Sequence, residues 1–144
     1  MGECGVDCKY IFYPGDKTLV ITDGIMDDWN NWLDVPWNKT MGNIKKVTIR
    51  ETKNIGKNAF YGATSLVTVD LHPDIESISD YSFYNCSAIE TITLPEHLKT
   101  IGNNTFTDCD KLTTLIIPSE VTTIGNEAFS NMDLLGVRDF PARI

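Results

Sequence analysis

The chain has 144 residues, 42% of them hydrophobic, which is enough for one domain with a buried core. Its 20 acidic and 12 basic residues give a net charge of −8, which disfavours nucleic acid and anionic membrane surfaces as partners, because both attract clustered Lys and Arg. No apolar run approaches the roughly 18 residues that a membrane-spanning helix needs, so we expect no direct membrane insertion.

Residues 1–43 do not share the pattern of the rest of the chain and are predicted to form an N-terminal cap. Two apolar runs flank the turn sequence Pro-Gly-Asp at 14–16, so residues 9–22 are predicted to be a β-hairpin. The following segment contains all the tryptophans of the chain: Trp29, Trp32 and Trp37. A stack of repeats exposes its core at each end, so we interpret these side chains as a lid over the first repeat rather than a ligand-binding aromatic cluster.

A fixed period of 23 residues runs through the rest of the chain. It is set by four phenylalanines: Phe60, Phe83, Phe106 and Phe129. An isoleucine precedes each of them by five residues, and Leu or Ile follows each by six. Such self-similarity is typical of stacked repeats. The repeats are therefore predicted to occupy residues 44–144: a partial unit at 44–54, then 55–77, 78–100, 101–123 and 124–144.

Each repeat is predicted to contain a turn-and-helix part, such as IGKNAF at 55–60, followed by a β-strand with the pattern L-x-x-L-x-L. The strands of successive repeats are expected to be parallel neighbours. No single repeat can bury its own apolar face, so the core should run continuously through the stack. The expected fold is a solenoid with a parallel sheet on one face and short helical or turn segments on the other.

The four cysteines fall into two groups by their place in the sequence. Cys86 and Cys109 occupy one column of the repeat and are expected to be buried free thiols, although neighbouring repeats are close enough for a disulfide. Cys4 and Cys8 lie outside the repeats and have the option of pairing with each other. Their spacing does not match a zinc knuckle, and no second ligand pair follows.

The repeats ISDYSFYNCSAIETITLPEHLKT and IGNNTFTDCDKLTTLIIPSEVTT resemble the BspA-like class of leucine-rich repeats, whose unit is similar to I-G-x-x-A-F-x-x-C-x-x-L-x-x-I-x-I-P. The cap also resembles a segment found ahead of such repeats, through Cys4-Gly5, Pro36-Trp37 and IKKVTI at 44–49. Three departures are His72 where proline is usual, Met132 where cysteine is usual, and Arg138, which the period places in an inward-facing strand column.

The resemblance implies a leucine-rich repeat solenoid. The family is frequent in surface proteins of host-associated bacteria and of protists such as trichomonads and amoebae, where it is associated with adhesion and surface antigens. On this basis we expect a protein-binding module, on the cell surface or secreted, that contacts a host cell or an extracellular-matrix protein. Three glycosylation sequons agree with that location: Asn38, Asn85 and Asn103.

Two alternatives to an adhesin stay open. The first ten residues lack the basic and apolar regions of a signal peptide, which favours a cytoplasmic location and an intracellular scaffold with a soluble protein partner. Self-association through the sheet edge at the C-terminal end of the stack is the second alternative.

If a partner binds, the strand residues that point away from the core are the expected contact surface, which we call the sheet face. Its members are Lys46, Thr48, Thr68, Asp70, Thr91, Thr93, Thr114 and Ile116. The sheet face is small, rich in threonine and weakly charged. Threonine also favours strands because its branched side chain suits a pleated surface, so the threonine column has a structural interpretation beside the binding one.

No pattern of reactive residues indicates an enzyme. The two histidines, His72 and His97, fall in different columns of the repeat and have no nucleophile partner set by it. Single glycines occur in turns, whereas a phosphate-binding loop needs several together. The acidic residues of the cap do not have the spacing of an EF-hand loop. We therefore predict no catalytic residues, no metal ligands and no cofactor.

Overall fold

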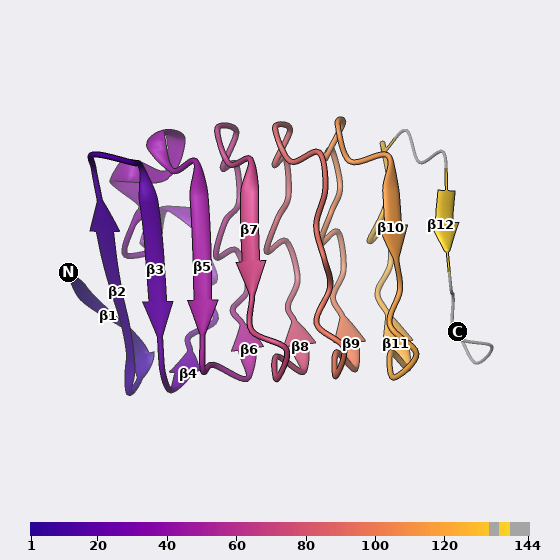
Figure 1. Cartoon of the computed structure of the whole chain (residues 1–144), viewed down its shortest axis with the longest axis horizontal. Helices are drawn as coiled ribbons and strands as arrows, with labels where there is room; N and C mark the ends of the chain where they lie inside the picture. Colours follow the sequence, from indigo (N-terminus) through magenta and orange to yellow (C-terminus); the bar gives the residue numbers. More distant parts are fainter. Residues whose placement is uncertain (133–135, 139–144) are drawn as a thin grey trace.

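Strands from successive repeats lie side by side along the long axis of the molecule (Figure 1). The computed structural model describes residues 1–132 and 136–138. The cap contains β1 (Gly2–Val6), β2 (Cys8–Tyr13), β3 (Thr18–Thr22), β4 (Ile25–Met26) and two 3-10 helices, η1 (Trp32–Asp34) and η2 (Asn38–Asn43). The later strands are β5 (Lys46–Arg50), β6 (Asn54–Ile55), β7 (Thr68–Leu71), β8 (Ser77–Ile78), β9 (Thr100–Ile101), β10 (Thr114–Ile116), β11 (Thr123–Ile124) and β12 (Gly136–Arg138).

The hairpin predicted at residues 9–22 is confirmed, because β2 and β3 pair antiparallel across it. Strand β3 then pairs in parallel with β5, and β5 with β7, so the hairpin continues directly into the repeat sheet. Leu19 lies beside Val47 and Ile21 beside Ile49, and all four side chains are buried. The full order of this sheet is β4-β1-β2-β3-β5-β7, and a disulfide joins Cys4 of β1 to Cys8 of β2. The division into a cap at 1–43 and repeats from residue 44 stays a prediction.

A second parallel sheet, which the sequence analysis did not predict, consists of strands of two residues each. Its order is β11-β9-β8-β6, and it pairs Ile55 with Ile78, Ile78 with Ile101, and Ile101 with Ile124. In Figure 1 these short strands form a row along the lower edge of the molecule, near the lower ends of the longer strands. The isoleucine before each phenylalanine is therefore a strand residue that turns its side chain into the core.

The short helical segments predicted within the repeats are replaced by consecutive turns in the part of the chain that the structure describes. Two columns of residues there have left-handed backbone, which a right-handed helix does not accept. One column is Asn58, Tyr81, Asn104 and Glu127, and the other is Gly62, Asn85, Asp108 and Asn131. The backbone N–H groups between them bond across repeats: Phe60 donates to Ser82 O at 2.8 Å and Phe83 to Thr105 O at 3.0 Å.

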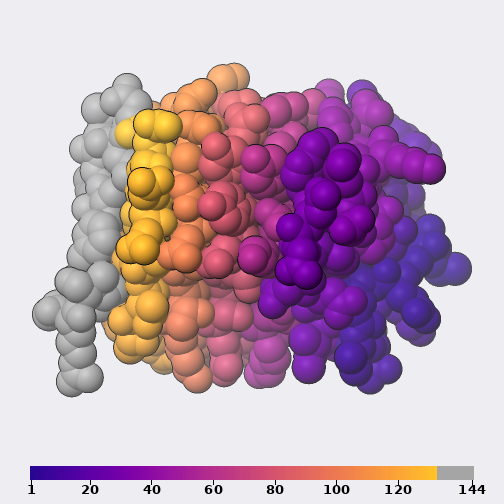
Figure 2. Space-filling model, turned by 180° about the vertical axis from the view of Figure 1, so that it is seen from behind, coloured from indigo at the N-terminus to yellow at the C-terminus, as the bar shows by residue number. Residues whose placement is uncertain are grey.

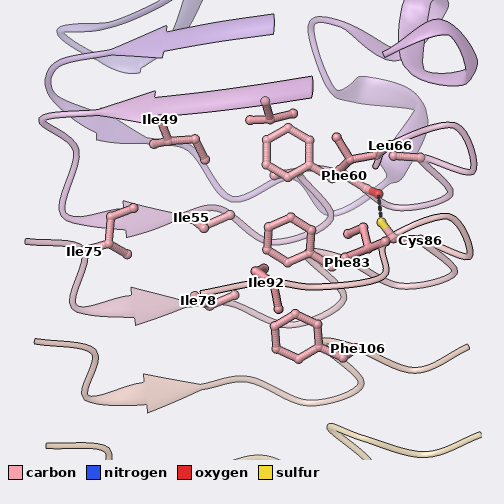
Figure 3. Close-up of a cluster of buried hydrophobic side chains, with 14 of the residues drawn as sticks. Ile49, Ile55, Phe60, Leu66, Ile75, Ile78, Phe83, Cys86, Ile92 and Phe106 are labelled. Carbon is pink, nitrogen blue, oxygen red and sulfur yellow. Dashed lines mark hydrogen bonds between the residues drawn. The ribbon is translucent and has the colours of Figure 1, made fainter. Parts of the chain in front are cut away.

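Phenylalanine side chains form the centre of the core (Figure 3). The ring centroids of Phe60 and Phe83 are 5.3 Å apart, and those of Phe83 and Phe106 are 5.6 Å apart. All three rings are fully buried, and each pair is stacked. The column continues to Phe129, whose ring centroid is 6.0 Å from that of Phe106. Each repeat thus contributes one ring to a single column that crosses the repeat boundaries.

Two of the three tryptophans cover the N-terminal end of this column. The Trp37 ring stacks on Phe60 with centroids 5.7 Å apart, and its indole N–H donates to Ala59 O at 2.8 Å. Trp29 packs edge-on against Trp37 at 5.4 Å. The prediction of a lid is wrong for Trp32, which is 42% exposed and stacks on Tyr61 at the molecular surface. Its place in η1 turns it away from the core.

The last strand is shifted by one residue from the expected register. Strand β12 pairs in parallel with β10, placing Val137 beside Leu115 and Arg138 beside Ile116. The 23-residue period placed Arg138 at the register position of Leu115. Arg138 therefore takes the register position of Ile116 rather than that of Leu115, because the chain between β10 and β12 is one residue shorter than the period requires.

We expect Phe83→Ala to lower the free energy of unfolding by about 3–5 kcal/mol, because it leaves a cavity between two stacked rings. Urea denaturation followed by circular dichroism measures this loss. Tyr13→Ala, which removes an exposed aromatic ring from the hairpin, is the control, with an expected change below about 0.5 kcal/mol. Similar losses for the two variants would contradict the stacked core.

We expect Asn85→Val to cost about 1–2 kcal/mol of stability, because a β-branched residue disfavours the left-handed backbone that Asn85 adopts, with φ of 57°. Asn85→Gly should retain or slightly raise stability, since glycine accepts this conformation without strain. Thermal denaturation of the two variants makes the comparison. Equal melting temperatures would count against a conformational requirement at this turn.

Candidate functional site

The structure places the residues of the predicted sheet face on one side of the long strands. Alternation along each strand produces this arrangement, since Val47 and Ile49 point inward while Lys46 and Thr48 do not. Register then brings Lys46 beside Thr68 and Thr48 beside Asp70. Seven of the eight sheet-face residues are exposed, Thr48 is half-buried, and Ile116 is 61% exposed. Their role in binding stays a prediction.

The sheet face is interrupted in its middle at residues 91–94. Within the described part of the chain, no backbone hydrogen bond joins this segment to β7 or β10. Ile92 and Leu94 still face the core, but 9% and 7% of their surfaces are exposed, against 0% and 1% for Val47 and Ile49. The segment therefore keeps the inward-outward alternation of a strand without the pairing of one. Its sequence, T-I-T-L, gives no physical reason for the break.

Two hollows flank this unpaired segment, each of about 340 Å³. The first lies between residues 91–94 and β10, with Pro118 at its border. The second lies between Thr93 and β7, with Pro73 and Pro95 at its border. Thr93 borders both hollows and Thr91 borders the first, and the backbone polar groups of the segment have no partner in β7 or β10.

The hairpin extends the sheet face beyond the residues that the sequence analysis selected. Register places Thr18, Val20 and Thr22 of β3 beside Lys46, Thr48 and Arg50 of β5. The next strand, β2, adds exposed Ile11 and Tyr13. The signal was present, because T-L-V-I-T at 18–22 has the same alternation as K-V-T-I-R at 46–50. It was missed because residues 1–43 were treated as a cap separate from the repeats.

The two cysteines of the repeats are unsuited to act as nucleophiles. Cys86 and Cys109 are buried free thiols, and their Sγ–H groups donate to Phe60 O at 3.2 Å and Phe83 O at 3.1 Å. Burial raises the pKa of Cys86 well above its ordinary value and the pKa of Cys109 to about 12. Because the thiolate is the reactive form, neither side chain supplies one near neutral pH.

The histidines make local contacts at the surface, and Gly56 is required by close packing of the backbone. His97 Nδ1 lies 3.3 Å from Glu120 Oε1, an exposed pair 23 residues apart, and His72 Nδ1 accepts a bond from the Asp74 N–H at 3.1 Å. A Cβ atom at Gly56 would collide with the carbonyl oxygen of Asp27, so glycine is needed there for close packing.

Among residues 1–132 and 136–138, no group of three or more His, Cys, Asp or Glu side chains is placed to hold a metal ion. The same residues contain no helix that is long and apolar enough to cross a membrane.

A family model described as the BspA type leucine rich repeat region matches residues 38–143 in 6 copies. No curated protein matches the chain.

Several solved bacterial structures share the fold. A leucine-rich repeat protein of T. pallidum is 22% identical with a TM-score of 0.71, and the match covers 91% of this chain and 68% of that one. One from Eubacterium ventriosum is 24% identical with a TM-score of 0.79, covering 92% and 38%. One from Bacteroides ovatus is 22% identical with a TM-score of 0.68, covering 95% and 41%. The chain thus matches about two fifths of the length of the last two proteins, and identities this low show the fold alone.

Because the two buried thiols keep their protons in the folded state, we expect stability to fall as the pH rises. In the unfolded chain a thiol ionises near its ordinary pKa of about 9, whereas folded Cys109 holds its proton up to a pKa of about 12. Its stabilising contribution is therefore complete below about pH 9 and is lost between about pH 9 and pH 12. Urea denaturation across this range measures the effect.

The variant Cys86→Ala with Cys109→Ala should show a shallower loss and controls for tyrosine titration. At pH near 8, a thiol reagent should modify Cys86 and Cys109 only after unfolding. Rapid modification of the folded protein would contradict the burial of these side chains.

Proposed function

The chain belongs to the BspA-type leucine-rich repeat family, and we propose that it is a non-catalytic protein-binding module that engages its partner through the sheet face. Repeat solenoids generally present their extended sheet surface to other proteins. In this chain the proposal is carried by one observation, which is the unpaired segment 91–94 between two hollows in the middle of an exposed face. A partner gains contact area and backbone hydrogen-bond groups at the same place.

The chemistry of the sheet face suits a protein better than a charged polymer. Along the stack axis, Lys46 is followed in one column by the threonines at positions 68, 91 and 114, and Asp70 lies beside Thr48 in the next column. Exposed Ile116 and the hairpin residues Ile11 and Tyr13 add apolar area toward the two ends. A non-obligate protein interface is, as a whole, about as apolar as the rest of a protein surface, so a mixed face of this kind suits a protein partner.

We further propose that the protein acts outside the cytoplasm, as an adhesin or surface antigen that contacts a host-cell or matrix protein. The Cys4–Cys8 disulfide supports this location, because disulfides persist in oxidising compartments and are rare in the cytosol. The family is often associated with cell surfaces, which also supports it. Glycans on Asn38, Asn85 and Asn103 of protein isolated from its native source would agree with this location.

The test measures saturable binding of the purified chain to immobilised matrix proteins and to host cells. The variant carries Thr68→Lys, Thr91→Lys and Thr114→Lys, which add three bulky charges to the middle of the sheet face. We expect binding at least about tenfold weaker than that of the parent. Biolayer interferometry gives the affinities, and circular dichroism checks that the variant is folded.

The matched control carries Thr64→Lys, Asn126→Lys and Thr123→Lys, three exposed positions outside the sheet face with the same change of charge. It should bind as the parent does. Equal weakening of both variants would show a general charge effect, and undiminished binding by the sheet-face variant would place the contact on another surface. Absence of binding to any matrix protein or host cell would contradict the adhesin proposal.

A further inference from the structure

Four aromatic side chains gather where η1 meets the turns around Phe60 and Phe83, away from the sheet face. We call Trp32, Tyr61, Tyr81 and Tyr84 the aromatic cluster. The Trp32 and Tyr61 rings are stacked with centroids 5.9 Å apart, and the Tyr61 and Tyr84 rings are stacked at 4.7 Å. The Tyr81 ring lies beside them, 5.6 Å from that of Tyr84 and 6.3 Å from that of Tyr61. Figure 2 shows the corresponding surface, where the cap segment in dark purple lies over the repeats.

The positions of these rings are held by two separate parts of the chain. Tyr61 and Tyr84 are equivalent residues of successive repeats, each directly after a fully buried phenylalanine. Trp32 belongs to η1, whose first turn is capped by the Asn31 side chain. Sequence periodicity did not reveal the cluster because Trp32 is 29 residues away from Tyr61 and outside the repeats.

The cap segment that carries Trp32 is fastened to the first repeat by buried and short hydrogen bonds. The Asn58 amide donates to Trp29 O at 2.6 Å, and the Trp29 N–H donates to Lys57 O at 3.2 Å. The Lys57 N–H donates to Asp28 Oδ1 at 2.7 Å. The cluster is therefore assembled before any ligand arrives, which lowers the entropic cost of binding.

A hollow of about 350 Å³ opens at the cluster. Its lining is Asn30, Asn31, Trp32, Lys57, Asn58, Tyr61 and Tyr81. Trp32 is 42% exposed, and because one face of its ring stacks on Tyr61, the exposed area belongs to the other face and the edges. The hollow falls near the lower end of the size range of small-molecule sites, which is roughly 300–1,000 Å³.

Polar groups of the lining are left without protein partners among the described residues. They include the Trp32 indole N–H, the Tyr61 and Tyr81 hydroxyl groups and the Asn30 amide. The lining contains one cation, Lys57, and no carboxylate. Lys57 is accompanied by the Asp28 carboxylate, which accepts a hydrogen bond from the Lys57 N–H at 2.7 Å, so no net charge at the site favours a cation or an anion. The lining therefore favours a neutral ligand that combines apolar area with several hydrogen-bonding groups.

A sugar ring has this combination, because its C–H bonds cover a flat face while hydroxyl groups surround the edge. The C–H face packs on an aromatic ring, and the hydroxyl groups bond to donors beside it. We propose that the aromatic cluster binds a neutral oligosaccharide, with Trp32 as the stacking platform and Asn30, Tyr61 and Tyr81 as hydrogen-bonding partners. This site is separate from the sheet face and does not depend on its proposed role.

The experiment uses the full chain and three neutral tetrasaccharides: cellotetraose, maltotetraose and the N-acetylglucosamine tetramer. Trp29 and Trp37 are buried, so a change of tryptophan emission on titration reports mainly on Trp32. We expect at least one tetrasaccharide to bind with a Kd below about 10 mM and to shift the emission to shorter wavelength. Isothermal titration calorimetry provides an independent affinity.

Trp32→Ala should weaken that binding by at least about tenfold, and Trp32→Phe should restore part of it, because a smaller ring still offers a stacking face. Tyr13→Ala, at an exposed ring outside the cluster, and the triple lysine variant of the sheet face should bind the sugar as the parent does. If Trp32→Ala is not folded by circular dichroism, Tyr81→Ala replaces it, with an expected loss of at least about threefold.

Failure of all three tetrasaccharides to bind at about 10 mM would overturn the proposal. Unchanged affinity in folded Trp32→Ala would also overturn it, since the aromatic cluster would then serve only to hold the cap. Loss of sugar binding in the sheet-face variant alone would move the sugar site to that face. Loss of matrix-protein binding in the sheet-face variant, with sugar binding retained, would support both proposals independently.

Discussion

The stacking of one phenylalanine ring on the next is the interaction on which the rest of the structure depends. A repeat of 23 residues is too short to enclose a core of its own, so its ring is buried only when the neighbouring repeats are in place. The backbone of each repeat also depends on its neighbour, because N–H groups around each phenylalanine donate to carbonyl groups of the next repeat. Phe60 has no phenylalanine before it in the column, and Trp37 stacks on its free side instead. The segment before the repeats thus covers the core where a preceding repeat would otherwise lie.

Periodicity explains which features were predictable from sequence. The phenylalanine column, the buried thiols and the hairpin followed from spacing, alternation and turn residues, and the structure has all three. The turns in place of helices coincide with two left-handed columns, one made of Asn, Asp and Gly and the other of two Asn with Tyr81 and Glu127, a weaker signal than the apolar pattern. The one-residue shift at Arg138 arises from the length of a connection, which apolar spacing alone does not define.

The two candidate sites also differ in how much of each was predictable from the sequence. Strand alternation predicted the positions of the sheet face, of which seven are exposed and Thr48 is half-buried, but it gave no indication that residues 91–94 lack their ladder bonds. The aromatic cluster joins Trp32 of the cap to a tyrosine column of the repeats, so it exists only in three dimensions. Contacts between an irregular segment and a repeat produce no periodic pattern in the sequence, so periodicity does not predict them.

The direction of the hydrogen bonds between repeats has a mechanical consequence. In the parallel strand pairs and in the turns, these bonds run along the stack from one repeat to the next. Tension applied along that axis loads the interfaces in series, so the molecule should yield by peeling one repeat at a time at low force. Tension applied across the axis would instead have to shear several strands together. The molecule should therefore resist tension across the stack better than tension along it.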